Sequence, residues 1–339
     1  MMARITIKDV AARAGVSYQT VSKVLNHQGN VSPETEARIW EAVQESGYRP
    51  NVSARNLRTQ SSNLIGYAWQ RSLDDSPRPI LDQFLYDAIS TAEQHGYHLL
   101  TFLVDLKDAA GVPIYKELYD RRQVEGFILA DTNHNDPRIA YLMEQDIPFA
   151  SFGRANDDWD FCWVDIDGRH GLRIVVDHLI EQGHRQIGLL TWPEGSEAGA
   201  YREEGFVDSL RNAGLEVRPD WILRGTNTVQ FGAEGMQHFR ARPYDERPTA
   251  VACVSDVIAI GALNDANAAG LCVGQDIAIT GYDDIPMAQY LTPSLTTVRQ
   301  PIVAVGQRVV DLLLQQIREE PITEKGILLK PELIIRESS

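Results

Sequence analysis

The sequence contains little cysteine and no long apolar segment. Its three cysteines, Cys162, Cys253 and Cys272, are far apart and form no CxxC pair, so the sequence predicts neither a disulfide framework nor a zinc site. No apolar run approaches the ~20 residues that span a bilayer, and we therefore expect no membrane contact. The segment from Met1 to Thr6 lacks the apolar core of a signal peptide, which predicts a cytoplasmic protein.

The sequence also lacks the motifs of common enzymes. It contains no GxGxxG or GxxxxGK[ST] phosphate-binding motif, no GxSxG nucleophile motif and no HExxH pair. A doubly wound sheet without its phosphate fingerprint does not support a dehydrogenase. We therefore expect a protein that is not an enzyme and that holds neither a metal nor a cofactor.

Charge is distributed unevenly along the 339 residues. The formal net charge is -15, yet residues 1–60 carry eight Lys and Arg against five Asp and Glu. A small basic segment on a large acidic body predicts that the segment meets a polyanion while the body is repelled by it.

The basic segment has the pattern of a helix-turn-helix. Thr6, with Asp9 three positions later, can begin a first helix, and Gly15 permits the turn after it. Ser17 can cap a second helix, and a third is expected from Ser32 to Gly47. Residues 1–49 are thus predicted to form an all-α head, and the polar stretch 50–62 a linker.

From residue 64 onward, strand-like runs alternate with amphipathic helical stretches. The expected strands cover residues 64–69, 98–104, 126–130, 149–152, 186–190, 250–254 and 277–282, and the expected helices residues 79–96, 168–182, 200–213 and 256–269. This alternation predicts α/β architecture with parallel sheets covered by helices on both faces. Because the length exceeds what one sheet normally holds, we expect two doubly wound lobes with a cleft between them.

The lobes can be given approximate limits. We assign residues 63–162 and 299–325 to the first lobe, and residues 163–298 and 326–339 to the second. Ligands of doubly wound sheets bind beyond the carboxyl ends of the strands. The residues that follow the strands are therefore the place to look for a binding site.

The second helix of the head has one polar face. Tyr18, Gln19, Ser22, Lys23 and Asn26 share the side opposite its apolar residues. An amide such as Gln19 can pair with adenine, and a cation such as Lys23 can reach guanine acceptors or phosphate. A solvated polar face is the alternative that spacing alone leaves open.

These residues, together with later motifs, resemble the lactose-repressor family of bacterial transcription regulators. The resemblance rests on TIKDVA at 6–11, AGVSYQTVSKVLN at 14–26, YRPN at 48–51, ARNL at 54–57, GHR at 183–185, GYDD at 281–284 and TTVRQP at 296–301. It implies a homodimer with a DNA-binding head, a hinge helix and a body similar to periplasmic sugar-binding proteins. It also implies that operator contacts come from Thr6, Ser17, Tyr18, Gln19, Thr20, Ser22, Lys23 and Asn26. Lys23 stands where relatives often have Arg, so its contact with guanine is expected to be less directional.

In the linker, the resemblance implies a wedge. Leu57 is a large apolar residue in a polar stretch, and paired hinges would insert it between base steps through the minor groove. Asn51, Ala54 and Arg55 would lie along the same groove. A minor packing contact of Leu57 with the body is the alternative.

In the body, the resemblance implies a site for a sugar effector. Arg202 and Asp283 match positions that grip hydroxyl groups, and Trp163 matches a stacking aromatic. Position in the predicted fold adds Trp69, Arg154, Asp256 and Gln300. A structural ion pair between Arg202 and Asp283 is the alternative for these two. Ser255 stands where many relatives have Asn, and Gly153 where some sugar binders have Asp. Two expectations stay open: a ligand that differs from a simple galactoside, or missing contacts supplied by Arg154 or water.

The sequence therefore predicts a sequence-specific transcription regulator, a repressor that a sugar or oligosaccharide releases from a pseudo-palindromic operator. Two alternatives stay open: a regulator that needs a purine corepressor, and a solute-binding protein of a transporter. The basic head disfavours the transporter protein. The chain ends without a leucine heptad tail, so we expect a dimer rather than a tail-joined tetramer.

Overall fold

A computed structural model describes residues 5–25, 29, 31–48, 61–70, 78–104 and 112–339. The chain divides into two compact units, Met1–Ser62 and Asn63–Ser339. In the first unit, the head, three helices are described: α1 (Ile7–Ala14), α2 (Tyr18–Leu25) and α3 (Pro33–Ser46).

The helices of the head begin and end where the sequence predicts. The Asp9 carboxylate accepts the backbone N–H and the hydroxyl of Thr6, both at 2.8 Å, at the start of α1. These hydrogen bonds lower the pKa of Asp9. Gly15 adopts the left-handed conformation at φ 66° that ends α1. Val10, Val21 and Ile39, one from each helix, are fully buried and form the centre of the core, so the head has a hydrophobic core of its own.

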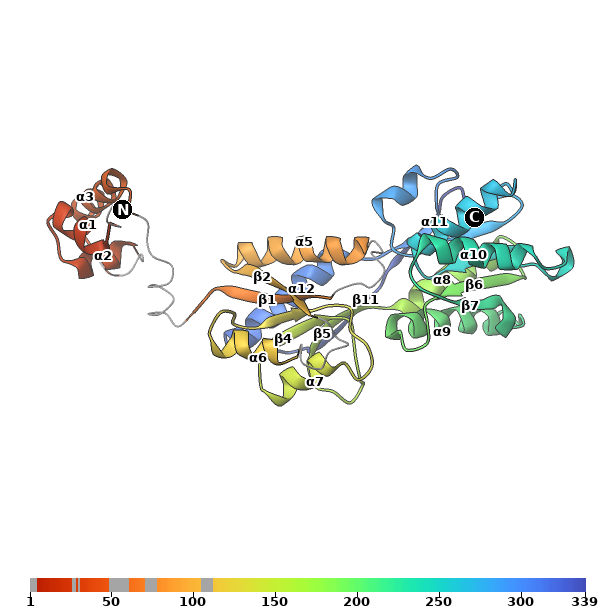
Figure 1. The fold of residues 1–339 in the computed structure, drawn as a ribbon, viewed down its shortest axis with the longest axis horizontal. Helices are drawn as coiled ribbons and strands as arrows, with labels where there is room; N and C mark the ends of the chain where they lie inside the picture. The colour runs from red at the N-terminus through yellow and green to blue at the C-terminus, as the bar shows by residue number, and fades with distance from the viewer. Residues whose placement is uncertain (1–4, 26–28, 30, 49–60, 71–77, 105–111) are drawn as a thin grey trace. The chain divides into compact units, whose positions relative to one another are not determined.

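The second unit, the body, contains two sheets of parallel strands in separate lobes (Figure 1). The first lobe has six strands in the order β11-β5-β4-β3-β1-β2. They are β1 (Leu64–Gln70), β2 (His98–Val104), β3 (Phe127–Leu129), β4 (Phe149–Phe152), β5 (Cys162–Ile166) and β11 (Gly326–Leu329). Its helices are α5 (Pro79–Gln94), α6 (Pro113–Asp120), α7 (Pro137–Glu144) and α12 (Ile302–Ile317). α5 and α12 bury one face of the sheet, and α6 and α7 bury the other.

The second lobe has four parallel strands in the order β7-β6-β8-β9. They are β6 (Ile187–Thr191), β7 (Ile222–Arg224), β8 (Ala250–Cys253) and β9 (Ala278–Thr280). The helices pack as pairs, α8 (Gly168–Glu181) with α9 (Glu197–Asn212), and α10 (Val229–Arg240) with α11 (Asp256–Ala268). Three short 3₁₀ helices cover Pro219–Trp221, Tyr244–Glu246 and Pro286–Tyr290.

Glycines let the helices of the second lobe approach closely. A Cβ atom on Gly205 of α9 would lie 2.1 Å from the carbonyl oxygen of Arg169 in α8. One on Gly232 of α10 would lie 1.9 Å from the carbonyl oxygen of Ile258 in α11. Larger residues at these positions would force the pairs apart.

The α/β fold class is confirmed, but the predicted lobe limits need correction. Residues 163–166 and 326–329 were assigned to the second lobe, whereas β5 and β11 pair with each other in the first sheet. The reason is that β5, with the sequence CWVDI, alternates buried and half-buried side chains and completes this sheet before the chain leaves it. β10 (Thr297–Arg299) and β12 (Glu332–Ile334) form a separate antiparallel pair. β10 precedes α12 along the chain, and β12 follows β11.

The other predicted elements are present within three residues of their expected ends. The helices α6, α7, α10 and α12 and the strands β5, β7, β10, β11 and β12 were not named among the expected elements. Among the described residues, no helix is long and apolar enough to cross a membrane, and no cluster of His, Cys, Asp and Glu suits a metal ion.

Candidate functional site: the polar face of the head and the effector residues of the body

The predicted recognition face of the head is formed by α2. Tyr18, Gln19 and Lys23 are exposed, and the exposed fraction of Tyr18 is 53%. Val21 and Val24 on the opposite side are buried in the core. The helix therefore presents amide, phenol and ammonium groups to solvent, which are groups that can reach base edges and phosphates.

Other predicted operator residues have structural contacts. The Ser17 Oγ accepts the backbone N–H of Thr20 at 3.2 Å and lies 2.9 Å from the hydroxyl of Thr20. Ser17 thus caps α2 as predicted. Thr6 fills the corresponding place at the start of α1, and Ser22 is half-buried. Asn26, Asn51, Ala54, Arg55 and Leu57 lie outside the described residues.

In the body, Arg202 lies on α9 and is 7% exposed. Its guanidinium stacks on the ring of Tyr282 at 3.7 Å and on the ring of Trp192 at 4.7 Å. One terminal nitrogen donates to the carbonyl of Val254 at 2.5 Å. The Nε atom is buried and has no partner among the described residues. A buried donor without an acceptor is costly, which marks Arg202 as a candidate for ligand contact.

Asp283 follows β9 and is half-buried. Its carboxylate accepts the amide of Gln300 at 2.6 Å. Burial raises the pKa of Asp283 well above its usual range, although the nearby positive charge of Arg202 acts in the opposite direction. Its φ of 128° is unusual for a residue with a side chain. The structure therefore brings Asp283, Gln300 and Arg202 into one group, as the sequence predicts.

The structural ion pair that was the alternative reading of this group is not observed. Among the described residues, Arg202 and Asp283 form no ion pair within 4.0 Å, whereas the adjacent Asp284 pairs with Arg336 at 2.6 Å and with Arg299 at 2.7 Å. Thus Asp284 is neutralised by the protein itself, and Asp283 is held by an amide. This difference leaves Asp283 available for hydroxyl donors.

Aromatic rings surround Arg202 on both sides. Tyr282 is fully buried, and a Cβ on Gly171 of α8 would lie 2.6 Å from its hydroxyl oxygen. Burial raises the pKa of the Tyr282 phenol. The Tyr282 hydroxyl and the Trp192 indole N–H, like Arg202 Nε, are buried without partners among the described residues. Unsatisfied polar atoms concentrate here because the scaffold supplies rings and few acceptors.

Asp256, which was predicted to contact the effector, has its hydrogen bonds inside the protein. Its side chain is fully buried, and its two oxygens accept the hydroxyl of Thr297 at 2.5 Å and the backbone N–H of Ile285 at 2.9 Å. Burial raises the pKa of Asp256 to about 6. The carboxylate lies at the start of α11 and connects the loop after β9, through Ile285, with β10, through Thr297. It therefore fixes the backbone on either side of the loop that carries Asp283.

Arg154 and Trp163 form a second group in the first lobe. Arg154 Nε donates to Asp165 at 2.8 Å, and its guanidinium lies 5.7 Å from the ring of Trp163. It also stacks at 3.9 Å on Tyr201, which belongs to α9 of the second lobe. The ring of Trp163 covers Gly326, where a Cβ would lie 2.4 Å from it. Trp163 therefore supports Arg154 in addition to any contact with a ligand.

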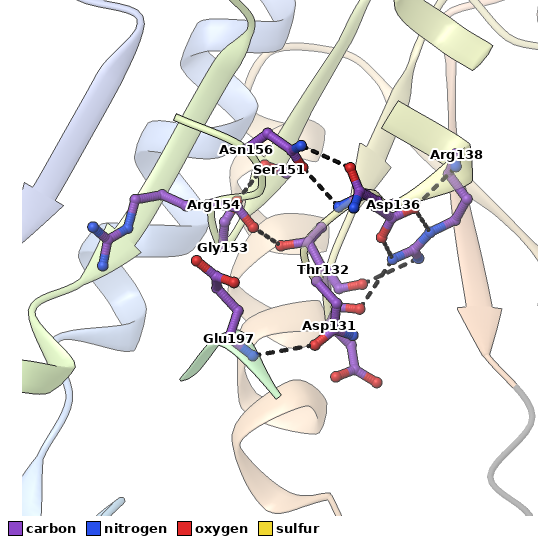
Figure 2. Close-up of polar contacts among 12 residues, drawn as sticks. Asp131, Thr132, Asp136, Arg138, Ser151, Gly153, Arg154, Asn156 and Glu197 are labelled. Carbon is purple, nitrogen blue, oxygen red and sulfur yellow. Dashed lines mark hydrogen bonds and ion pairs between the residues drawn. The ribbon is translucent and has the colours of Figure 1, made fainter. Parts of the chain in front are cut away.

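The loop after β3 also reaches the second lobe (Figure 2). Asn133 Oδ1 accepts the backbone N–H of Glu197 at 3.4 Å, at the first turn of α9. Thr132 donates to the carbonyl of Arg154 at 2.8 Å. The loop is fixed by Arg138, which is fully buried and donates to both carboxylate oxygens of Asp136, at 3.0 and 2.6 Å. First-lobe residues thus hold the helix that carries Arg202.

Trp69 lies at the end of β1 in the first lobe. With Tyr67, Arg78 and Asp131 it lines a shallow hollow near the carboxyl ends of β1 and β3, and Arg78 pairs with Asp131 at 2.6 Å. Sequence reasoning missed Trp192, Tyr201 and Tyr282 in the Arg202 and Arg154 groups. Trp192 directly follows β6, so the rule that ligands bind beyond strand ends could have found it.

Comparison with known proteins identifies the chain. The pattern described as "Bacterial regulatory proteins, lacI family" matches residues 6–51, and that of a "Periplasmic binding protein-like domain" matches residues 176–339. The transcriptional repressor PurR of Escherichia coli O139:H28 is 34% identical over 98% of this chain and 96% of its own. The chain belongs to the LacI family.

Solved structures of LacI-family proteins agree along nearly the whole chain. A Lac repressor dimer bound to operator is 29% identical with a TM-score of 0.86, and covers 98% of each chain. The regulator CelR in complex with cellobiose is 28% identical with a TM-score of 0.75, and covers 99% of this chain and 100% of its own. This LacI-family protein is therefore a DNA-binding transcriptional repressor with a ligand-binding effector domain. Its relatives are repressors, not enzymes or transporter components.

Proposed function

We propose that the protein is a homodimeric repressor that acts on DNA in the cytoplasm, binds a pseudo-palindromic operator and leaves it when a sugar binds the body. A single head offers too little surface for tight specific binding, so two heads on paired half-sites are needed. The Lac repressor dimer bound to operator supports this arrangement for a relative of the same fold. The exposed residues of α2 would read bases, and Leu57 would act as a wedge in the minor groove.

The group formed by Arg202, Asp283 and Gln300 carries the proposal for the effector. The guanidinium of Arg202 and the half-buried carboxylate of Asp283, which interact electrostatically, would offer a donor and an acceptor to neighbouring hydroxyl groups. The Trp192 ring offers an apolar surface for the C–H face of a sugar. A relative that binds cellobiose supports the same ligand class. Trp69, Arg154 and Trp163 would complete the site from the first lobe.

Release follows if the sugar prefers one arrangement of the lobes. A ligand shifts an equilibrium only by its differential affinity for the two states. Asn133 and Arg154 of the first lobe contact α9 of the second lobe. A shift of α9 would therefore also act on the first lobe. A sugar that pulls on Arg202 would therefore change the relation of the lobes and with it the placement of the hinges.

A purine corepressor is the second candidate, because the full-length match to PurR is 34% identical and aromatic rings also suit a flat heterocycle. Fluorescence anisotropy on a selected operator separates the two. A thermal-shift screen would first identify the sugars that bind, because a ligand at ~100 times its Kd adds about 2.7 kcal/mol to the stability of the form it binds. Those sugars should then weaken operator binding by the wild-type protein. Tighter operator binding on addition of purine bases, with no response to sugars, would contradict the proposal.

A further inference from the structure

Arg154 lies on the loop after β4, and hydrogen bonds fix this loop within the first lobe (Figure 2). The carbonyl of Arg154 accepts the Thr132 hydroxyl at 2.8 Å, and the carbonyl of Gly153 accepts the Ser151 hydroxyl at 2.6 Å. A Cβ on Gly153 would lie 2.4 Å from the hydroxyl oxygen of Thr132, so glycine permits this close approach. The backbone of Arg154 is therefore held in place relative to the first sheet.

The side chain of Arg154 has partners in both lobes. Its Nε donates to Asp165 of β5 at 2.8 Å, and this ion pair lies wholly within the first lobe. Its guanidinium also stacks at 3.9 Å on the ring of Tyr201, which belongs to α9 of the second lobe. If the lobes separate, the pair with Asp165 can persist, whereas the contact with Tyr201 must break. We call the contact between Arg154 and Tyr201 the interlobe clasp.

Tyr201 directly precedes Arg202 on α9. A Cβ on Gly168 of α8 would lie 3.6 Å from the Cβ of Tyr201 and 3.2 Å from the Cγ of Arg202, so both residues pack against the same point of α8. Burial, together with a hydrogen bond to Glu197 one turn earlier, raises the pKa of Tyr201 to about 12. The ring that meets Arg154 is thus fixed on the helix that carries Arg202.

We propose that Tyr201 is a positioning residue, which through the interlobe clasp holds Arg154 of the first lobe and Arg202 of the second lobe at the spacing that the effector needs. This inference rests on the proposed effector site, in which both arginines contact the ligand. A sugar shifts the lobes only if the free protein has access to more than one arrangement. Its apparent Kd is the intrinsic Kd divided by the fraction of molecules in the binding arrangement. Loss of the clasp lowers that fraction and raises the apparent Kd.

The first test is calorimetric titration of the full chain with the sugar that binds wild type most tightly. A guanidinium on an aromatic face changes such an equilibrium by roughly two- to thirtyfold. Tyr201→Leu removes the aromatic face and should raise the Kd by about threefold or more, whereas Tyr201→Phe keeps the face and should stay within about twofold of wild type. The matched control is Arg218→Met, which removes a guanidinium that stacks on Trp221 at 4.4 Å inside the second lobe and should leave the Kd unchanged.

A second measurement separates the clasp from a direct contact of Tyr201 with the sugar. Spin labels at Ala140→Cys on α7 and Asn264→Cys on α11, both exposed positions, report the distance between the lobes. The labels are placed in a background without the exposed Cys272, and labelled chains are diluted with unlabelled ones. The sugar should enrich one distance population in wild type. Without sugar, Tyr201→Leu should contain less of that population than wild type or Tyr201→Phe.

The outcomes separate the clasp from the proposed function, and circular dichroism reports that each variant is folded. An unchanged Kd in Tyr201→Leu, an equal loss in Tyr201→Phe, or a raised Kd with an unchanged distance distribution would overturn the clasp and leave the sugar effector standing. If no sugar binds wild type, the proposed effector fails, and the distance distributions without sugar test the clasp by themselves. A distribution that Tyr201→Leu leaves unchanged would then overturn the clasp as well.

Discussion

Two buried arginines in the body are held in opposite ways. Arg138 in the first lobe donates to both oxygens of Asp136 and to the carbonyls of Ala130 and Asp131, at 2.6 to 3.2 Å. Arg202 in the second lobe has one hydrogen bond, to Val254, and two aromatic rings. Both are almost completely buried. Burial alone therefore does not separate the arginine that fixes a loop from the arginine that we propose for effector binding.

The difference lies in how many donors the protein satisfies. Arg138 has acceptors for its guanidinium because it must fix a loop, and a buried charge pair of this kind is stable only with good geometry. Arg202 keeps Nε without an acceptor, between rings that cannot accept strongly. Arg202 is therefore the buried arginine that we assign to the proposed effector site. Four predictions test this distinction, beginning with the largest effect.

Arg138→Met should produce the largest loss of stability. The change leaves the Asp136 carboxylate, 3% exposed, without its partner. Breaking a buried pair from one side typically costs about 3 to 5 kcal/mol, and urea unfolding of the body would measure it. The double variant Asp136→Leu with Arg138→Met should recover much of this loss, because no charge is then left unpaired. A single variant as stable as wild type would contradict the assignment of Arg138 to the scaffold.

Asp256→Asn should change the pH dependence of stability. Burial raises the pKa of Asp256 to about 6 in the folded state, so folding favours its uncharged form. Its contribution to stability is full below about pH 4 and is lost as the pH rises through 6. The stability of wild type minus that of the variant should therefore fall between pH 4 and pH 7, by about 3 kcal/mol at most. Denaturant titrations across this range measure it, and a difference that rises with pH would contradict this prediction.

Asp283→Ala should affect the effector and leave stability nearly unchanged. Among the described residues, the Asp283 side chain accepts a hydrogen bond only from the amide of Gln300, so the change mainly removes an acceptor for the sugar hydroxyls. We expect at least about a tenfold increase in the effector concentration for half-maximal release, which corresponds to 1.4 kcal/mol. Operator affinity without effector should stay at the wild-type value. Asp284→Ala is the control, because Asp284 is paired with Arg299 and Arg336 and should lose stability instead.

The last prediction concerns the head, where the same distinction separates Ser17 from Gln19. Ser17→Ala removes a cap and should destabilise the head by about 1 kcal/mol. Gln19→Ala alters an exposed side chain, so thermal unfolding should not change, while cognate operator binding weakens by roughly 1 to 3 kcal/mol. Equal losses by Gln19→Ala on cognate and scrambled DNA would show that Gln19 does not read sequence.

The head could be predicted from sequence because its signals are local. Thr6 with Asp9, Ser17 and Gly15 act within a few residues, and each occupies the expected place. The alternation of strands and helices likewise predicted the two lobes. The predicted lobe limits at residues 163 and 326 were wrong because β5 and β11, which come from distant parts of the chain, pair as parallel neighbours in the first sheet. No local pattern shows which sheet a short strand joins.

The candidate site in the body could be predicted in part. Arg202, Asp283 and Gln300 come together because strand ends of one lobe share an edge. Asp256 has the same sequence position relative to its strand, yet it turns inward to Thr297 and Ile285. Trp192 turns toward Arg202. The direction of a side chain at a strand end depends on tertiary packing. Position along the sequence therefore identifies candidate residues, but it does not show which of them would touch a ligand and which only bond within the protein.

The most direct test of this account is an operator-release titration with Arg202→Met, using the sugar that binds wild type most tightly. The account predicts that the variant binds operator with wild-type affinity, unfolds within about 1 kcal/mol of wild type and stays on the operator at effector concentrations that release wild type completely. Release of the variant at the wild-type effector concentration would contradict the claim that the incompletely paired Arg202 is the centre of the effector site.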